Sequence, residues 1–162
     1  MSSLPPLLSS QLSSLVKGPA LLPIIQADTP HEAVAIAKAL ADGGVGSVEV
    51  VLRTRQALAA ITAIRTALPD LLVGAGTILS AADANACKDA GAQFLVSPAS
   101  TPKHLEAMID TGLPLAPGVA TPSEIAMAYE YGLREVKFFP AHLSGGIEML
   151  KALSGVFQQV KF

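Results

Sequence analysis

The stretch SVEVVLRT, residues 47–54, sets two charged side chains into an otherwise apolar strand pattern. Successive side chains of a strand point to opposite faces, so the charged residues share one face and their purely apolar neighbours share the other. The charged face holds Glu49, Val51 and Arg53. A charge that faces a protein interior is costly unless it is paired or lies in a wetted cavity. The pattern therefore predicts a buried strand with a polar site on its inner face.

A second strand of this kind occurs at EVKFFPA, residues 135–141, where Lys137 and Phe139 share a face of an apolar run. Removing an amine from water favours its neutral form, and a neutral amine is the nucleophile that a Schiff base requires. Taken alone, each residue has a structural alternative. Lys137 can be an edge lysine whose amine extends to water, and Glu49 with Arg53 can be a buried ion pair.

One unit repeats along the chain: a short apolar run, a helix-start signal, an amphipathic Ala- and Leu-rich stretch, and a glycine. Such a unit is one β-strand followed by one α-helix. Helix starts are marked by TPHE at 29–32 and TPSE at 121–124, where a capping box is expected, and more weakly by TP at 101–102. The expected strands span residues 21–27, 47–53, 71–77, 94–98, 113–119 and 135–141, with a last one beginning near Gln159.

Strands that are buried on both faces read as continuous apolar runs, so the sheet is expected to be parallel and covered by helices. An open doubly wound sheet and a closed barrel both fit this order of elements. Polar residues at the carboxyl ends of several strands favour the barrel, although Thr77 alone would also fit a helix cap. These residues are Arg53, Thr77, Ser97 and Lys137. Because the G-x-G-x-x-G fingerprint is also missing, we predict an α/β fold of the (β/α)8 TIM-barrel type.

The chain is expected to divide into an N-terminal amphipathic helical segment, residues 1–18, and a barrel domain, residues 19–162. The barrel domain contains six complete strand-and-helix units and the opening of a seventh strand, whereas a closed barrel has eight strands. The expectation is therefore a barrel that is incomplete at its carboxyl end. An open barrel leaves two strand edges with unpaired backbone groups.

The composition narrows the classes of partner. The chain has 162 residues, a formal net charge of −2 and a hydrophobic fraction of 51%, so neither a nucleic-acid surface nor a membrane-binding patch is indicated. The single cysteine, Cys87, cannot form a disulfide framework and is predicted to be an inert core residue of a helix. Since the N-terminus also does not have the pattern of a signal peptide, we expect a cytoplasmic protein that binds small molecules.

No cofactor or metal is expected. His31, His104 and His142 are dispersed along the sequence and are predicted to be surface residues, so they suggest no metal site. The pair Gly145-Gly146 could hold a phosphate at a helix N-terminus, although a plain turn is the simpler explanation.

Taken together, the motifs resemble those of the 2-keto-3-deoxy-6-phosphogluconate (KDPG) and 4-hydroxy-2-oxoglutarate (KHG) aldolase family. The resemblance covers nearly all of the chain beyond the first eighteen residues, in order and at consistent spacing. Its motifs are GGVGSVEVVLRT (43–54), LVGAGTIL (72–79), AGAQFLVSPA (90–99), LPLAPGVATPSE (113–124) and YGLREVKFFPAHLSGG (131–146).

The resemblance implies a class I aldolase, a lyase that works without a metal. Lys137 would form a Schiff base with the keto acid, and Glu49 would act as the general acid and base. Arg53 and Thr77 would hold the carboxylate of pyruvate. Pro98 and Phe139 would shape the pocket. The substrate would be KDPG, cleaved reversibly to pyruvate and glyceraldehyde 3-phosphate, and the protein would be a homotrimer.

The chain departs from the family pattern at Val51 and Ala99, where the family usually has threonine and glycine. It also stops before a C-P-T-G-G turn and an eighth strand whose glycines bind the substrate phosphate. Two alternatives to the KDPG reaction follow. One is an aldolase that prefers KHG or the galactonate epimer of KDPG. The other is an inactive fragment or assembly scaffold that keeps the site residues.

Overall fold

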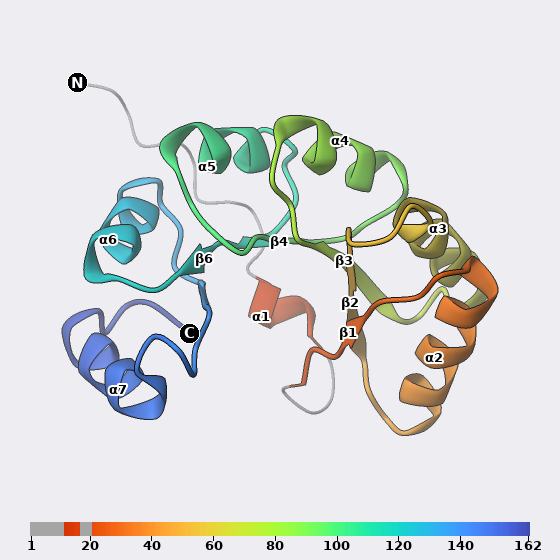
Figure 1. The fold of residues 1–162 in the computed structure, drawn as a ribbon, viewed down its shortest axis with the longest axis horizontal. Helices are drawn as coiled ribbons and strands as arrows, with labels where there is room; N and C mark the ends of the chain where they lie inside the picture. The colour runs from red at the N-terminus through yellow and green to blue at the C-terminus, as the bar shows by residue number, and fades with distance from the viewer. Residues whose placement is uncertain (1–11, 17–20) are drawn as a thin grey trace.

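The structure, a computed structural model, describes residues 12–16 and 21–162. Parallel strands curve around a common axis, and helices cover their outer side (Figure 1). The helices are α1 (Leu12–Leu15), α2 (Pro30–Asp42), α3 (Ala57–Ala67), α4 (Ala81–Asp89), α5 (Pro102–Ile109), α6 (Pro122–Glu130) and α7 (Gly146–Val156). The strands are β1 (Ile24–Ile25), β2 (Ser47–Val51), β3 (Leu72–Gly76), β4 (Leu95–Val96), β5 (Leu115–Ala116), β6 (Gly118–Val119) and β7 (Lys137–Phe138). No helix in the described ranges is long and apolar enough to cross a membrane.

The strands pair in parallel in two sheets, one of order β1-β2-β3-β4-β5 and one of order β6-β7. The single strand expected at 113–119 is divided, because Pro117 between β5 and β6 has no backbone N–H to donate. The Pro117 carbonyl still accepts a hydrogen bond of 2.9 Å from the Lys137 N–H. Residues 115–119 therefore pair with β4 through β5 and with β7 through β6, so the curvature continues from one sheet into the next.

The strands are shorter than their apolar runs. The run at 21–27 contains only the two-residue strand β1, and the run at 135–141 contains only the two-residue strand β7. At the end of β2 the Arg53 N–H donates to the Val51 carbonyl at 2.8 Å, which turns the chain out of the sheet. The expected extension of this strand to residue 53 is therefore wrong, and Arg53 belongs to the loop.

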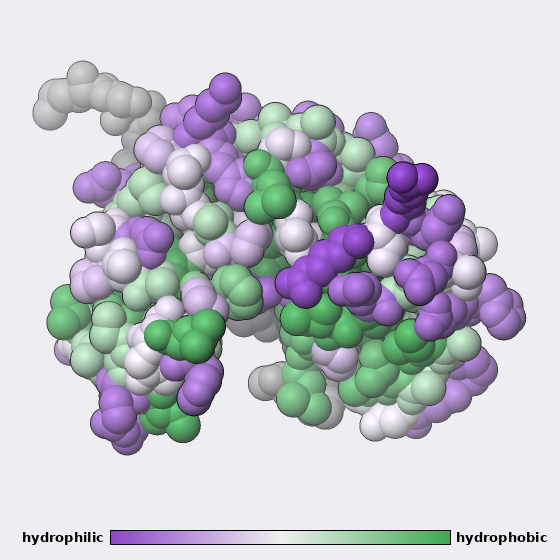
Figure 2. Space-filling model, viewed as in Figure 1, coloured by the Kyte–Doolittle hydropathy of each residue, from purple (hydrophilic) through white to green (hydrophobic). Residues whose placement is uncertain are grey.

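The barrel is not closed within the described residues. The opening of the expected seventh strand forms a single parallel bridge between Glu135 and Lys161. On the other side, β1 pairs only with β2 in the described ranges, and its Ile24 is 53% exposed. Figure 2 shows this face of the molecule hollowed between the β1 side and the α7 side.

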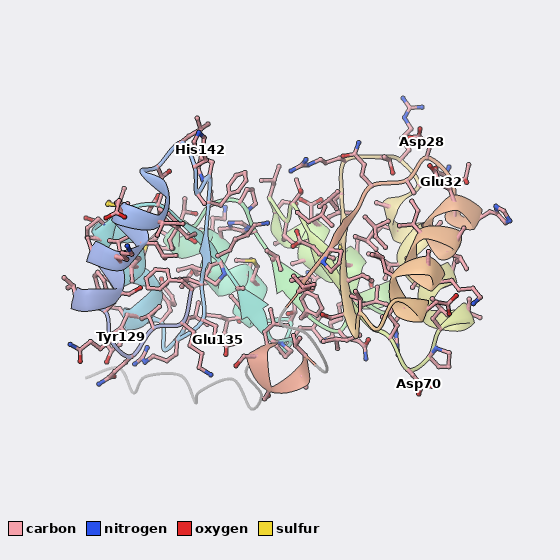
Figure 3. The ribbon with its side chains drawn as sticks, turned by 90° about the horizontal axis from the view of Figure 1, so that it is seen from below. Asp28, Glu32, Asp70, Tyr129, Glu135 and His142 are labelled. Atoms are coloured by element: carbon pink, nitrogen blue, oxygen red, sulfur yellow. The ribbon has the colours of Figure 1, made fainter. Side chains whose placement is uncertain are left out.

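All strands run in the same direction along the axis (Figure 3). Asp28, which follows β1, and His142, which follows β7, lie at one end of the molecule. Asp70 and Glu135, which precede β3 and β7, lie at the opposite end. The carboxyl ends of the strands therefore meet at one mouth, as in the predicted barrel.

The hydrophobic core has two parts. The larger part lies between the sheet and the helices, and it contains Val48 and Val50 of β2. The smaller part lies inside the barrel and contains Phe94, Val96 and Ala116 with Leu12 of α1. The predicted division of β2 into an outer apolar face and an inner face that carries Glu49 is confirmed.

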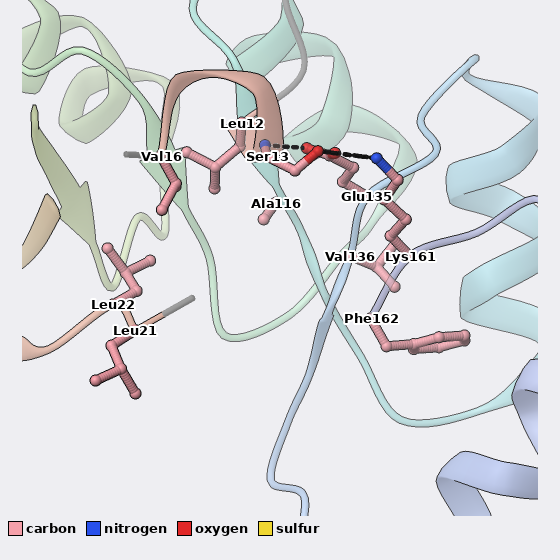
Figure 4. A pocket seen from close by; sticks show the side chains of 10 residues that line it. All are labelled: Leu12, Ser13, Val16, Leu21, Leu22, Ala116, Glu135, Val136, Lys161 and Phe162. Carbon is pink, nitrogen blue, oxygen red and sulfur yellow. Dashed lines mark hydrogen bonds and ion pairs between the residues drawn. The ribbon is translucent and has the colours of Figure 1, made fainter. Parts of the chain in front are cut away.

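Helix α1 lies beside Glu135 (Figure 4), at the end of the molecule where Glu135 precedes β7 (Figure 3). The backbone N–H of Ser13 donates to the Glu135 carboxylate at 3.0 Å, its hydroxyl donates to the other carboxylate oxygen, and the Lys161 amine lies 3.7 Å from that carboxylate. These residues and their apolar neighbours border a cavity of about 440 Å³. Helix α1 lies within the helical segment expected at 1–18, of which residues 1–11 and 17–18 lie outside the described ranges.

The predicted helix caps are present. The threonine hydroxyls at 29, 101 and 121 each accept a hydrogen bond from the backbone N–H three residues on. Thr121 forms the full capping box, because Glu124 accepts from its backbone N–H at 2.8 Å. Glu32 differs, since it accepts from the N–H of Asp28 rather than of Thr29. At the helix ends, four glycines have a left-handed backbone conformation: Gly44, Gly91, Gly112 and Gly132.

Replacing Thr121 with alanine is expected to lower the free energy of unfolding by about 1 kcal/mol, because the first turn of α6 loses its side-chain acceptor. Urea unfolding followed by circular dichroism measures the change. Ser123→Ala is the matched control, since Ser123 is exposed in the same first turn. Equal losses in the two variants would show that the capping box does not stabilise the helix.

Candidate active site

Glu49 and Lys137 meet inside the mouth of the barrel. Their strands β2 and β7 are far apart in the sequence, yet Lys137 Nζ lies 3.5 Å from Glu49 Oε1. The Glu49 side chain is 3% exposed and the Lys137 side chain is 27% exposed. The carboxylate side chain is therefore shielded, while the lysine side chain is partly exposed. Sequence reasoning left open whether Lys137 was an edge lysine, and this geometry places it facing a buried carboxylate.

The pKa of the Glu49 carboxyl is raised above its ordinary value. Burial is the largest cause, because it disfavours the charged form. The charges of Lys137 and Arg53 and the hydrogen bond from Lys137 act in the opposite direction without outweighing burial. A carboxylate with a raised pKa is a stronger base than an ordinary glutamate, and a larger share of it is protonated at a given pH.

Arg53 follows β2 in the loop at the mouth and is exposed. Its charge lowers the pKa of Glu49, yet its guanidinium forms no hydrogen bond or ion pair with any residue that the structure describes. A buried ion pair between Glu49 and Arg53 is therefore not what the structure contains. A guanidinium in this place can bind a carboxylate in the forked geometry for which arginine is suited.

Thr77 directly follows β3 at the same mouth and has a φ of 62°. This left-handed conformation is costly for a β-branched residue, and such strain is typical of functional sites. Thr77 does not cap α4, because the cap is Ser80, whose hydroxyl accepts from the Asp83 N–H at 3.1 Å. The alternative reading of Thr77 as a helix cap is therefore wrong.

Phe139 and Pro98 follow the strands β7 and β4. Phe139 follows β7, and the centroid of its ring lies 5.3 Å from Lys137 Nζ. Pro98 lies two residues beyond β4, directly after the fully buried Ser97. The Ser97 hydroxyl donates to the Ala99 carbonyl at 2.8 Å and accepts from the Gly118 N–H at 3.3 Å. Ser97 thus connects the end of β4 to the start of β6. Its hydroxyl forms no hydrogen bond with Lys137.

The cysteine and histidine predictions have mixed outcomes. Cys87 is fully buried in α4, and burial, with a smaller effect of Asp83, raises its pKa to about 12, which agrees with an inert core thiol. His31 and His142 are exposed as predicted. His104 is not a plain surface residue, because its Nε2 is shielded and has no hydrogen-bond partner in the described ranges. Three or more potential metal ligands do not gather anywhere in residues 12–16 and 21–162.

The two adjacent glycines at 145 and 146 form the start of α7. Gly145 caps the helix with a φ of 98°, and Gly146 has a φ of 58°. These backbone angles are unfavourable for residues with a side chain. The pair is thus a turn that leads directly into α7, and phosphate binding at this turn stays a prediction.

Sequence reasoning missed Gly76, the last residue of β3. An ideal Cβ at this position would lie 1.9 Å from Glu49 Oε1, so the carboxylate occupies the space of the missing side chain. A glycine inside an otherwise apolar strand often marks such a close approach. This signal is present in the letters of LVGAGTIL, residues 72–79.

The chain matches one family of known proteins over almost its whole length. Residues 12–162 match the family described as KDPG and KHG aldolase. The KHG/KDPG aldolase of Escherichia coli strain K12 is 44% identical over 154 residues, which are 95% of this chain and 72% of that protein. The 2-dehydro-3-deoxy-phosphogluconate aldolase of Pseudomonas aeruginosa is 40% identical over 95% of this chain and 70% of its own length.

Solved structures of the same family superpose on this fold. The KDPG aldolase of Legionella pneumophila, with pyruvate captured at low pH as a covalent carbinolamine intermediate, is 41% identical. It aligns with a TM-score of 0.86 over 91% of this chain and 71% of its own. The aldolase of Zymomonas mobilis with 3-phosphoglycerate aligns with a TM-score of 0.87 at 37% identity, over 93% and 71% of the two chains. The chain belongs to the KDPG and KHG aldolase family, a family of lyases with a TIM-barrel fold.

Proposed function

We propose that this chain cleaves KDPG to pyruvate and glyceraldehyde 3-phosphate through a Schiff base on Lys137, with Glu49 as the general acid and base. The observation that carries the proposal is the distance of 3.5 Å between the lysine amine and the buried carboxylate. The pyruvate carbinolamine of the Legionella relative supports covalent amine chemistry. The relatives are named KHG/KDPG and KDPG aldolases, so the galactonate and inactive-scaffold alternatives are not favoured.

In the first step the neutral amine of Lys137 attacks the C2 carbonyl of the substrate and forms a carbinolamine. Loss of water then gives an iminium ion. Glu49 lies close enough to accept a proton from the attacking amine and to supply one to the departing hydroxyl, either directly or through a water. The covalent bond converts the C2 position into an electron sink.

In the second step the ionised Glu49 carboxylate removes the proton of the C4 hydroxyl. The C3–C4 bond breaks, its electron pair moves to the iminium nitrogen, and the aldehyde leaves. The remaining enamine takes a proton at C3 from the Glu49 carboxyl, and water then hydrolyses the iminium to release pyruvate and the free lysine. Each proton that Glu49 accepts is returned, so the residue ends the cycle as it began.

Arg53 and Thr77 are proposed to bind the carboxylate of the keto acid, with Pro98 and Phe139 as walls of the pocket. The Arg53 guanidinium is exposed at the mouth and has no protein partner in the described ranges, which leaves its donors for a ligand. The half-buried Thr77 follows the strand next to β2. The aromatic ring at 5.3 Å shields the lysine amine on one side.

Replacing Arg53 with alanine is expected to raise the KM for KDPG by about 10- to 100-fold, because a hydrogen bond to a charged group contributes about 1.5–3 kcal/mol. The change in kcat is expected to be smaller, since the carboxylate is bound alike in the ground state and the transition state. Steady-state kinetics measures both constants. Arg55→Ala is the control, because Arg55 is exposed in the same loop. An unchanged KM in the Arg53 variant would exclude it from carboxylate binding.

The pH profile of kcat/KM, which reports the groups of the free enzyme, is expected to have its acid limb above pH 4.5, the ordinary pKa of glutamate. Glu49 must be ionised to act as the base for cleavage, and its burial raises the pKa at which it ionises. Activity therefore rises as the pH increases through this raised pKa and is lost below it. Initial rates across the acid range measure the limb. A limb at or below pH 4.5 would contradict the assignment of Glu49 as the base.

Borohydride reduction in the presence of pyruvate tests the Schiff base directly. We expect a reduced pyruvate adduct on the Lys137 peptide in mass spectrometry, and activity that survives treatment with EDTA. If the adduct is absent, or if it is found on another lysine, the proposed function is wrong. Dependence on a divalent metal would favour a metal-assisted mechanism instead.

The same proposal includes a homotrimer in the cytoplasm. Multi-angle light scattering of the purified protein measures the mass of the assembly against 16.6 kDa for one chain. A mass of one or two chains would contradict the trimer. Fluorescence microscopy of the tagged protein in its own cell reports the location.

A further inference from the structure

Two glycines of β3 face the interior of the barrel. In the parallel register of β2 and β3, Glu49 is opposite Gly74 and Val51 is opposite Gly76. Paired residues of neighbouring strands point to the same face of a sheet. Glu49 belongs to the inner face, so the two glycines do as well. Each leaves a space inside the barrel, and the two spaces are filled differently.

Gly74 makes room for an aromatic ring of the core. An ideal Cβ on Gly74 would lie 2.1 Å from the ring of Phe94, which is fully buried inside the barrel. The ring is rigid and surrounded by Val96, Ala116 and Leu12. The space over Gly74 therefore serves packing.

Gly76 makes room for the Glu49 carboxylate. An ideal Cβ on Gly76 would lie 1.9 Å from Glu49 Oε1, 2.6 Å from Cδ and 2.8 Å from Cγ. Oε1 is also the atom that lies 3.5 Å from Lys137 Nζ. The oxygen that faces the lysine thus rests where a side chain at residue 76 would be, and any Cβ there displaces it.

We propose that Gly76 is a positioning residue, whose missing side chain creates the place in which the Glu49 carboxylate is held against Lys137. The inference rests on the proposed function, in which these two residues exchange protons. The atoms that a Cβ would displace are the far end of a flexible side chain and not backbone. A substitution at Gly76 therefore disturbs the position of the carboxylate more than it disturbs the fold.

The test compares Gly76→Ala with Gly74→Ala in the intact protein. The readout is the exchange of the methyl hydrogens of pyruvate for deuterium in D2O, followed by NMR, because this exchange needs both the imine and the base. We expect Gly76→Ala to slow the exchange on the order of 100-fold, the effect of misplacing a catalytic group by about 1 Å. We also expect kcat to fall with KM within about threefold of wild type. Borohydride trapping of pyruvate on Lys137 should remain.

Gly74→Ala is the matched control, since it crowds Phe94 in the same strand. We expect it to lower the melting temperature while the exchange rate stays within about threefold of wild type. Equal slowing of exchange in the two variants would overturn the proposal, because the effect would then follow from packing. A wild-type exchange rate in Gly76→Ala would also overturn it.

Double variants show whether Gly76 acts through Glu49. Adding Gly76→Ala to Glu49→Gln is expected to change the exchange rate by less than about threefold, because the base is already gone. If Gly76→Ala alone prevents folding, Glu49→Ala should restore folding, since it removes the three atoms that clash. Additive losses, or a failure of this rescue, would contradict the inference. Failure of the proposed function is distinct, because the wild-type protein would then neither trap pyruvate nor exchange its methyl hydrogens.

Discussion

The Lys137→Ala variant is expected to lose aldol cleavage by a factor on the order of 10⁴ or more, because no other group can form the imine on which every later step depends. The borohydride-trapped pyruvate adduct should disappear in the same variant. The loss is expected to be chemical, since the lysine side chain is 27% exposed and is not part of the hydrophobic core. Circular dichroism and the melting temperature should therefore remain close to those of the wild type.

Lys151→Ala provides the matched control. Lys151 is an exposed lysine of α7 whose only ion pair in the described ranges is with the exposed Glu148 at 3.2 Å. This variant should keep both the activity and the trapped adduct. If Lys137→Ala is labelled by pyruvate as strongly as the wild type, or keeps appreciable activity, the imine forms elsewhere and the assignment is wrong.

The Glu49→Gln variant is expected to lower kcat by about 10²- to 10⁴-fold, the usual contribution of a positioned acid or base. Glutamine keeps nearly the same shape and cannot accept the C4 hydroxyl proton. Because Lys137 remains, pyruvate should still be trapped by borohydride, although more slowly. This separation of trapping from turnover distinguishes the base from the nucleophile. Glu148→Gln, on the exposed surface of α7, is the control.

The same substitution has an effect on stability with a defined sign. Folding raises the pKa of Glu49, so the folded state binds its proton more tightly than the unfolded state does. The contribution of Glu49 to stability is therefore fully present below pH 4.5 and is lost as the pH rises through the raised pKa. Relative to wild type, Glu49→Gln should be more stable at about pH 7 than at about pH 4, measured by urea unfolding. The reverse order would show that Lys137 stabilises the ionised carboxylate more than burial disfavours it.

Much of the fold could be predicted from the letters of the chain because its signals are local. Threonine followed by proline marks the starts of α2, α5 and α6, and glycine marks helix ends. The alternation in β2 correctly separates an outer apolar face from the inner face of Glu49. The strand ends were overestimated, because hydrogen bonds such as that from the Arg53 N–H to the Val51 carbonyl end pairing inside an apolar run.

The sequence predicted which residues of the candidate site are unusual. It did not predict how the fold positions them relative to one another. Charged residues in apolar strands identified Glu49 and Lys137, and the structure brings them within 3.5 Å. The distance itself depends on the curvature of the sheet between β2 and β7, which no local pattern contains. The contribution of Gly76 was missed for a related reason. Its role depends on the Glu49 side chain, which a different strand places beside it.

The two glycines of β3 also bear on how stability and activity could be changed independently in this protein. The ring of Phe94 fills the space over one glycine, and the carboxylate of Glu49 fills the space over the other. On the inference drawn above, position 74 affects the melting temperature and position 76 affects turnover, so the two properties depend on different positions of one strand. Stability can therefore be engineered by repacking around Gly74 and Phe94 while Gly76 and Glu49 are kept. Changes at that distance from the carboxylate are expected to avoid the loss of activity that often accompanies stabilising mutations.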